Sequence, residues 1–582
     1  MKVKLAKTAG FCMGVRRALE MVLRVSHEEH KPIFTYGPLI HNPQVLDLLQ
    51  AKGICSCSSI EDIKSGCVVI RAHGVPFATK EKMLQTGLKV VDATCPHVAR
   101  VQVILKEFTK KGYLGIIVGD QDHPEVMGLL GYTHGRGVVV KSPQDLEAIA
   151  PQEKVVLVAQ TTQQGSVFEE IEKNARSRFK TLEVRNTICG ATRRRQEEAL
   201  SLARHVEAMI VVGGYNSGNT QRLVRISEEA GVNTFHVETE GELDLKALSQ
   251  MSSVGITAGA STPTWMIKKV TQRVERIRGK GESLIRSLAF RAIKFLLQSD
   301  LYVAMGAASH TYTSMNLQGL KNFRHVAIAL VTSMFYLYSM HVLNRFVDKE
   351  AAQYNDPDRT QFLLRFKTLL VFTGVASALG ALALSAYVGT VPFLFLFLIS
   401  LLGTFYSVPL LPTSLKKSGR SLRLKDIPGS KSLSVAAGWA SVTVLLPLLG
   451  TDMAIGSSTI PALFFVLIMA YIRSALIEVM DLQGDLIVGK ETLPILIGEN
   501  KTLTFLGFLV AFLSFFMAIV YFMGWGSSLF LWLELCCLYA AGYLWIYRKQ
   551  LTAKDERFEF LVESNSMLAG IITVLWAYWS KL

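Results

Sequence analysis

Several features that would assign this chain to a common protein class are absent from its sequence. No continuous apolar core occurs within residues 1–20, so we expect no secretory signal peptide and a cytoplasmic N-terminal part. No GxxxxGK[ST] motif and no flavin or nicotinamide fingerprint are present. The net charge of +15 comes without a nucleic-acid recognition motif, so we expect no nucleic-acid partner. In a cytosolic setting, the eight cysteines indicate metal, redox or packing roles rather than a disulfide framework.

Hydropathy divides the 582 residues into two parts, and the chain is longer than a single hydrophobic core usually supports. Up to about residue 281 the apolar runs are short and are interrupted by charges, glycine and proline. From about residue 301 onward, apolar stretches are long enough to span a membrane. We therefore predict a soluble domain over 1–280, a basic linker over 281–299 and a membrane domain over 300–582.

Short apolar runs in the first part alternate with helical patterns, which predicts an α/β domain with largely parallel strands. The loops that follow these runs are rich in glycine, threonine, serine, asparagine and histidine and poor in lysine. Because α/β folds place their sites beyond the strand ends, this composition predicts an anion held by neutral donors and backbone N–H groups. The predicted strands cover residues 68–70, 89–91, 114–118, 154–158, 208–212 and 253–256.

Three cysteines share a local pattern that indicates a threefold internal repeat. Cys12, Cys95 and Cys189 each follow a loop and precede a helical stretch with arginine a few positions on. We expect a lowered thiol pKa at such helix N-termini, which favours the thiolate that binds metal. Their separations of 83 and 94 positions exclude a compact ferredoxin run or zinc ribbon. The three thiols could instead meet at the axis of a three-lobed domain and hold a cluster. The other five cysteines are interpreted as ordinary packing residues.

The motifs of the first part together resemble the 4-hydroxy-3-methylbut-2-enyl diphosphate reductase (IspH/LytB) family. The resemblance covers about residues 1–280, with every motif in order. The motifs are GFCMGVRRA at 10–18, YGPLIHNP at 36–43, RAHGV at 71–75, DATCP at 92–96, HPEV at 123–126, QTT at 160–162, GNT at 218–220 and AGASTP at 258–263.

This resemblance implies a [4Fe–4S] cluster on Cys12, Cys95 and Cys189, with Glu125 delivering protons. It implies reductive dehydroxylation of the hydroxylated butenyl diphosphate to isopentenyl and dimethylallyl diphosphates, with a ferredoxin- or flavodoxin-like electron donor. Gly218 departs from the serine that the family often has there, but its backbone N–H remains, so we expect activity to survive. The implied diphosphate contacts are His41, His73, His123, Thr161, Ser217, Gly218, Asn219 and Ser261.

The second part predicts an all-α transmembrane bundle of about nine helices. The loops after the second, fourth, sixth and eighth expected spans all lie on one face, and their lysines and arginines make that face cytoplasmic. We therefore expect a multi-pass protein of the cell inner membrane, embedded in the lipid bilayer, with the reductase domain in the cytoplasm. The expected spans are 300–320, 326–346, 366–387, 391–411, 433–449, 460–480, 503–522, 529–545 and 560–579.

Acidic and amide residues at helical spacing lie near the ends of two spans. Asn344 and Asp348 form one i, i+4 pair, and Asp481 and Asp485 form the other. Such pairs suit Mg²⁺ ions that bridge a diphosphate. The basic residues expected to complement the phosphate charge are Arg359, Lys425, Lys431 and Lys490.

These motifs resemble the UbiA superfamily of intramembrane prenyltransferases over about residues 290–582, which implies transfer of a polyprenyl group to an acceptor that is often aromatic. The first motif is altered, because Ala352 stands where the family usually has an aspartate. A bifunctional enzyme and a reductase held by a degenerate membrane anchor therefore both remain open. A transporter or lipid-binding module with a redox-sensing domain would place ionisable residues deep within the spans, whereas the sequence suggests that they lie at the cytoplasmic ends.

Overall fold

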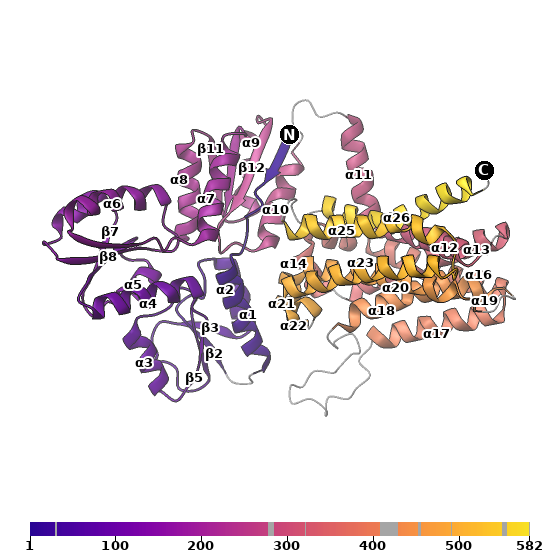
Figure 1. Cartoon of the computed structure of the whole chain (residues 1–582), viewed down its shortest axis with the longest axis horizontal. Coiled ribbons are helices and arrows are strands. Elements are labelled where there is room, and N and C mark those ends of the chain that lie inside the picture. Colours follow the sequence, from indigo (N-terminus) through magenta and orange to yellow (C-terminus); the bar gives the residue numbers. More distant parts are fainter. Residues whose placement is uncertain are drawn as a thin grey trace. The chain divides into compact units, whose positions relative to one another are not determined.

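The structure is a computed structural model and describes residues 1–28, 32–277, 284–320, 322–347, 349–407, 429–451, 455–490, 492–549 and 556–580. The chain divides into two compact units, Met1–Glu282 and Ser283–Leu582. The first unit is α/β and the second is helical in the part that the structure describes, as the sequence predicts (Figure 1). Each unit is described by itself below.

Three four-stranded parallel sheets form the first unit. Their orders are β3-β2-β4-β5, β7-β6-β8-β9 and β1-β12-β10-β11. The strands are β1 (Lys2–Leu5), β2 (Ile33–Tyr36), β3 (Ile54–Cys57), β4 (Cys67–Ile70), β5 (Lys89–Asp92), β6 (Leu114–Val118), β7 (Gly137–Val140), β8 (Lys154–Ala159), β9 (Thr181–Arg185), β10 (Ala208–Val212), β11 (Asn233–Val237) and β12 (Ser253–Ala258).

The six predicted runs all fall within strands, namely β4, β5, β6, β8, β10 and β12. Central strands such as β8 and β10 are buried along almost their whole length, which requires near-continuous apolar sequence in a parallel sheet. The strands that the sequence did not single out are the central strand β2 and five of the six edge strands, β1, β3, β7, β9 and β11. Edge strands such as β9 carry charges at exposed positions, so their hydrophobic signal is weak.

The helices of the first unit connect these strands and cover the sheets (Figure 1). They give each sheet its own hydrophobic core, such as the cluster that buries Ile116, Leu157 and Phe168. The helices are α1 (Met13–Glu28), α2 (Pro43–Ala51), α3 (Phe77–Gln85), α4 (Pro96–Lys110), α5 (Pro124–Leu130), α6 (Gly165–Arg178), α7 (Gly190–Ala203), α8 (Gly218–Glu229), α9 (Leu245–Leu248) and α10 (Thr264–Glu275).

The second unit is a bundle of helices. Seven of the nine expected spans correspond to helices long and apolar enough to cross a membrane, within the described residues. The other two fall on shorter helices, α12 (Leu301–Leu317) and α17 (Thr390–Ser407). The remaining helices are α11 (Leu284–Gln298), α13 (Phe323–Val347), α14 (Lys349–Asn355), α15 (Pro357–Arg365), α16 (Lys367–Val388), α18 (Ser430–Ala440), α19 (Leu446–Leu449), α20 (Thr459–Met480), α21 (Leu482–Val488), α22 (Leu493–Ile497), α23 (Glu499–Phe522), α24 (Leu529–Trp532), α25 (Glu534–Arg548) and α26 (Glu556–Trp579).

One span contains a π-helical segment, Ser441–Leu445, between α18 and α19. Pro447 follows this segment and has no amide hydrogen to donate to the preceding turn. The widened turn accommodates the missing hydrogen bond without ending the span.

The stretch expected to be a linker, 281–299, contains helix α11, which belongs to the second unit. The helix packs against α12, α15 and α26. Its run of leucine, isoleucine and phenylalanine residues explains why it folds onto the bundle instead of remaining an open connection.

Candidate functional sites

The three repeated cysteines occupy equivalent places in the fold. Cys12 lies between edge strand β1 and helix α1, Cys95 between β5 and α4, and Cys189 between β9 and α7. A Cβ added at Gly14 would lie 2.5 Å from the Cys95 sulfur and 3.9 Å from the Cys12 sulfur, so these two thiols share one space. Cys12 and Cys189 also lie close enough to Cys95 to raise its pKa. Three converging thiols beside a glycine-lined space fit an iron–sulfur cluster with one open corner.

Arginines from the cysteine-headed helices tie the three lobes together. Arg195, buried on α7, donates to the carbonyls of Thr8 (3.0 and 2.8 Å) and Gly10 (2.6 Å) in the loop that carries Cys12. Arg17 on α1 donates to the carbonyl of Thr94 at 3.1 Å, directly before Cys95. These arginines therefore position the cysteine loops by binding backbone oxygens.

The expected lowering of the thiol pKa is wrong for Cys95. Burial raises the pKa of this thiol, two backbone hydrogen bonds from the helix N-terminus oppose the rise, and the charges of the neighbouring thiols add to it. Desolvation of a thiolate outweighs a helix terminus when no positive charge contacts the sulfur.

Three histidines from two lobes form one cluster. His41 and His73 follow β2 and β4 of one sheet, whereas His123 follows β6 of another. Their ring centroids are 4.7 to 5.6 Å apart. Nε2 of His41 and Nδ1 of His73 are buried and have no hydrogen-bond partner. A ligand that accepts hydrogen bonds would satisfy them.

The charge state of these histidines follows from their burial. Desolvation lowers the pKa of His41 and of His73, and it lowers the pKa of His123 to about 4. These pKa values are lowered further by the charges of nearby Arg71 and Arg222 and of the other imidazoles. The free site therefore holds neutral imidazoles at neutral pH, and a bound anion would favour their protonation.

The third lobe completes the cluster of polar donors. Ser217 caps helix α8, and its hydroxyl lies 3.5 Å from that of Ser261, which donates to the carbonyl of His41 at 3.0 Å. A Cβ at Gly218 would make an ordinary contact with the His123 ring at 3.7 Å, but it would lie only 3.1 Å from a guanidinium nitrogen of Arg222. Both side-chain polar atoms of Asn219 are buried without a hydrogen-bond partner. The sequence-predicted diphosphate residues thus meet in one place.

Glu125 lies in the first turn of α5, two residues after His123. Its carboxylate accepts hydrogen bonds from the backbone N–H of Thr161 (2.7 Å) and from the Thr161 hydroxyl (2.9 Å). Thr161, predicted to contact diphosphate, is thus engaged with Glu125. Complete burial raises the pKa of Glu125, and the two bonds from Thr161 partly offset the rise. A carboxyl in this setting retains a proton more readily than an exposed one.

The sequence analysis did not identify Arg222, which lies on α8 one turn after the Ser217–Asn219 segment. Its buried guanidinium pairs with Asp120 at 2.6 Å and donates to Gln163 and Thr162, each at 3.2 Å. These contacts join α8 of the third lobe to the loops after β6 and β8. The position of Arg222, one helical turn after Gly218, was the available signal.

The helix that follows the first acidic motif contacts the second acidic motif. Helix α14 packs against α21, and Asn355 on α14 donates to Asp485 at 3.3 Å and accepts from the Gly484 amide at 3.0 Å. Asp485 is 1% exposed, one of its oxygens has no hydrogen-bond partner, and Lys490 lies 3.7 Å from the other. Oxygen donors of this kind fit Mg²⁺.

The structure describes some of the other residues predicted for this site. Asp348 and Lys425 lie outside the described residues. Asn344 lies in the last turn of α13, Asp481 joins α20 to α21, and Lys431 begins α18.

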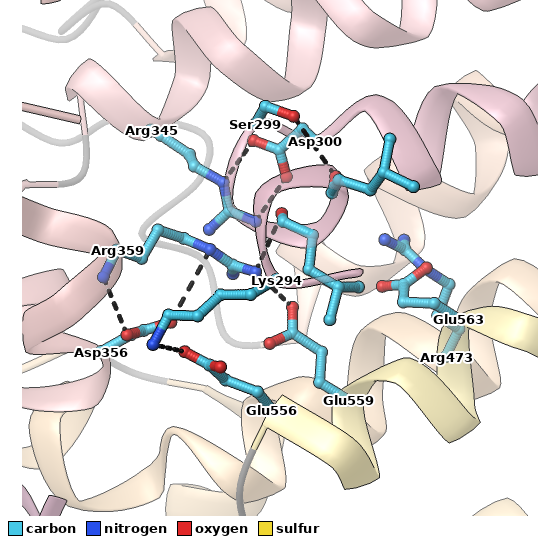
Figure 2. A network of polar contacts seen from close by, with 12 residues as sticks. Lys294, Ser299, Asp300, Arg345, Asp356, Arg359, Arg473, Glu556, Glu559 and Glu563 are labelled. Carbon is cyan, nitrogen blue, oxygen red and sulfur yellow. Dashed lines mark hydrogen bonds and ion pairs between the residues drawn. The ribbon is translucent and has the colours of Figure 1, made fainter. Parts of the chain in front are cut away.

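Arg359 differs from its expected role as a phosphate contact. Its guanidinium donates instead to Glu559 at 2.7 Å and to the carbonyl of Leu297 at 3.1 Å (Figure 2). The side chain is buried, and its charge is matched by carboxylates of the bundle.

Ionisable residues also lie deeper in the bundle than the sequence suggested. Arg473 lies seven residues before the end of α20, and it pairs with Glu563 of α26 at 2.6 Å. The two are 6% and 2% exposed, and the guanidinium also lies over the Trp439 ring at 5.2 Å. Hydropathy did not reveal this pair because it averages over consecutive residues, so the single charge of Arg473 is hidden within a long apolar stretch.

Comparisons with known proteins divide the chain in the same way. Residues 3–275 match the LytB protein family and residues 303–565 match the UbiA prenyltransferase family. The 4-hydroxy-3-methylbut-2-enyl diphosphate reductase of Geobacter sulfurreducens is 43% identical over 280 residues, which cover 48% of this chain and 99% of the relative. That of Aquifex aeolicus is 42% identical over 276 residues, covering 47% and 96%.

Solved structures match each half. One, described as "(E)-4-Hydroxy-3-methyl-but-2-enyl Diphosphate Reductase, the Terminal Enzyme of the Non-Mevalonate Pathway", is 42% identical and covers 48% of this chain and 100% of its own, with a TM-score of 0.39. A UbiA homolog from Archaeoglobus fulgidus bound to GPP and Mg²⁺ is 16% identical and covers 48% and 98%, with a TM-score of 0.35. The family matches and the close reductase relatives establish that this chain is a member of the 4-hydroxy-3-methylbut-2-enyl diphosphate reductase family, joined in one polypeptide to a member of the UbiA prenyltransferase family.

Proposed function

We propose that the first unit reduces (E)-4-hydroxy-3-methylbut-2-enyl diphosphate, with two electrons and two protons, to isopentenyl or dimethylallyl diphosphate and water. The observation that carries this proposal is the convergence of three lobes on one site. Each lobe supplies one cysteine at its edge strand and polar groups from the loops after its two central strands. Close relatives that carry the reductase name along their whole length support the same assignment.

The residues of the chain have separate tasks in this reaction. Cys12, Cys95 and Cys189 would hold a [4Fe–4S] cluster, which when bound supplies single electrons and a Lewis-acid iron for the substrate hydroxyl. His41, His73 and Asn219 would bind the diphosphate through the atoms that now lack partners.

Glu125 would give a proton to the departing hydroxyl oxygen so that the C–O bond breaks to release water. Its burial supports this role, because a retained proton is available for donation at neutral pH. A ferredoxin- or flavodoxin-like protein is the proposed electron donor.

The test is an anaerobic assay of the cluster-loaded full chain with the hydroxylated butenyl diphosphate and a chemical reductant. We expect both five-carbon products. A preparation with three cluster-bound cysteines and full iron content that yields neither product would refute the assignment.

We propose that the second unit transfers a polyprenyl group from its diphosphate to an aromatic acceptor, with Mg²⁺ held by Asn344, Asp348, Asp481 and Asp485. The contact between Asn355 and Asp485 supports this proposal, because it brings α14, the helix directly after the first acidic motif, against the second acidic motif. Lys425, Lys431 and Lys490 would complement the phosphate charge. The unit would lie in the cell inner membrane with the reductase on its cytoplasmic side.

Membranes that contain the chain would be incubated with labelled prenyl diphosphate and a panel of quinone and haem precursors. We expect one acceptor to be prenylated by the wild type and by neither Asp481→Ala nor Asp485→Ala. If no acceptor is prenylated, the alternative of a non-catalytic membrane anchor is correct.

A further inference from the structure

We propose that helix α11, which the sequence suggested was a simple linker, is a positioning element for the acidic site of the transferase. It acts through Lys294 and Arg359 on helices α14 and α15. The inference rests on the transferase activity proposed above and adds residues to that site. Figure 2 shows the polar network that carries it.

Lys294 joins α11 to two other helices. Its ammonium group lies 2.6 Å from Asp358 of α15 and 2.9 Å from Glu556 of α26. The Asp358 side chain is 6% exposed and the Glu556 side chain is 22% exposed, so water screens this contact poorly. Without the lysine, two partly buried carboxylates would lose the cation that joins them, which is unfavourable.

Arg359 makes the second connection between α11 and α15. It donates to the backbone carbonyl of Leu297 at 3.1 Å, near the end of α11, and to Glu559 of α26 at 2.7 Å. Asp356 caps α15 by accepting from the Arg359 amide at 3.0 Å. The first turn of α15 is therefore held against both α11 and α26.

The first turn of α15 is one residue from Asn355, which contacts the acidic site. Asn355 directly precedes Asp356 and bonds to both Asp485 and the Gly484 amide. The approach is so close that a Cβ at Gly484 would overlap the Asn355 side chain. A displacement of α15 would therefore draw Asn355 away from Asp485.

The other end of the network lies beside the first acidic motif. Asp300, at the joint between α11 and α12, is fully buried and adopts a left-handed backbone with φ of 60°. Both of its oxygens accept from Arg345, at 2.6 and 2.7 Å. Arg345 is next to Asn344 in the last turn of α13. The α11 region thus holds the two segments that flank the first motif.

The experiment compares Lys294→Met with Arg291→Met in the full chain, reconstituted in lipid nanodiscs. Arg291 is an exposed cation on the same helix and provides the matched control. Prenyl transfer is measured against prenyl diphosphate and Mg²⁺ concentration. Backbone amide exchange of α14 and α15 is measured without ligand.

For Lys294→Met we expect an apparent KM about tenfold higher and faster exchange in α14 and α15, because residues that contact the ligand-bearing helices hold the metal and phosphate ligands in place. Lys294→Arg should restore both values. Unchanged exchange in α20 and unchanged reductase activity would show that the chain is otherwise intact.

Equal behaviour of Lys294→Met and Arg291→Met in both measurements would overturn the inference. If the wild type transfers no prenyl group, the proposed transferase function fails by itself. Backbone amide exchange would then still test the inference, because unaltered exchange of α14 in Lys294→Met would contradict it.

Discussion

The two halves of this chain surround their candidate sites with different polar groups: neutral groups without partners face the reductase site, whereas ion pairs lie near the acidic motifs, where Asp485 also keeps one oxygen without a hydrogen-bond partner. In the reductase half, groups that face the site lack partners, such as both polar atoms of Asn219 and one ring nitrogen each of His41 and His73. In the helical half, charges near the acidic motifs are paired with one another, as in Asp300 with Arg345 and Arg473 with Glu563.

The difference reflects how each fold fixes its site. Parallel sheets hold the reductase loops through backbone hydrogen bonds, so the side chains are free to bind a ligand. Helices in a bundle have no hydrogen bonds between their backbones, so side-chain pairs must set their relative positions. Removing a free group should therefore impair catalysis or binding, whereas removing one of a pair should impair stability.

The largest effect is expected on kcat when Glu125 is replaced. Glu125→Gln keeps the shape of the side chain but removes the proton that it donates, so kcat should fall by about 10²- to 10⁴-fold. The visible spectrum of the cluster and the thermal unfolding of the protein should be unchanged. A variant that retains wild-type kcat would exclude Glu125 as the proton donor.

Arg473→Met tests the helical half. The substitution leaves Glu563 as an uncompensated buried charge, and we expect a loss of about 3–5 kcal/mol in stability of the bundle. Thermal unfolding in detergent, monitored by circular dichroism, would measure the loss. The double variant Arg473→Met with Glu563→Gln should recover part of it, and an unchanged unfolding temperature of the single variant would contradict the comparison.

Asn219→Ala should act on binding alone. The substitution removes a donor to a charged diphosphate, and such hydrogen bonds contribute about 1.5–3 kcal/mol, so KM should rise roughly 10- to 100-fold. Unfolding should change little, because neither polar atom of Asn219 has a partner in the free protein. Asn233→Ala, at the exposed start of β11, is the matched control. A marked loss of stability without a change in KM would contradict the comparison, because Asn219 would then stabilise the fold and not bind the diphosphate.

The smallest expected effect concerns pH. The pKa of His123 is lowered to about 4 in the folded state, mainly by burial, from an ordinary value of 6.5. As pH falls below about 6.5 the unfolded state takes up this proton first, so stability should decrease between pH 6.5 and about 4. His123→Gln should reduce the slope of unfolding temperature against pH in this window. A slope identical to the wild type would show that the folded-state pKa is not lowered.

Much of the reductase site could be predicted from the sequence. The repeated Cys-helix pattern identified Cys12, Cys95 and Cys189, and five of the six central strands were recognisable from apolar runs. Five of the six edge strands and Arg222 could not be predicted in this way, because half-exposed strands carry mixed sequence and a cross-lobe ion pair has no local pattern. The five remaining cysteines were less uniform than expected, since Cys55 is exposed whereas Cys67, Cys536 and Cys537 are buried.

For the helical half, the sequence determined the number and order of most spans and the acidic motifs, since hydropathy is a property of consecutive residues. The partners of its charges were decided only by the tertiary structure. Arg359, which we expected to contact phosphate, binds Glu559, 200 positions away.

Residues 281–299, which we expected to form a simple linker, show the same limit of prediction from the sequence. Its composition by itself indicated a basic linker, and only packing revealed that Lys294 meets Asp358 and Glu556. Local sequence determines which residues can form a helix or a charged end. Which distant carboxylate faces a given cation depends on how the helices pack, because an ion pair requires proximity in space that no spacing along the chain encodes.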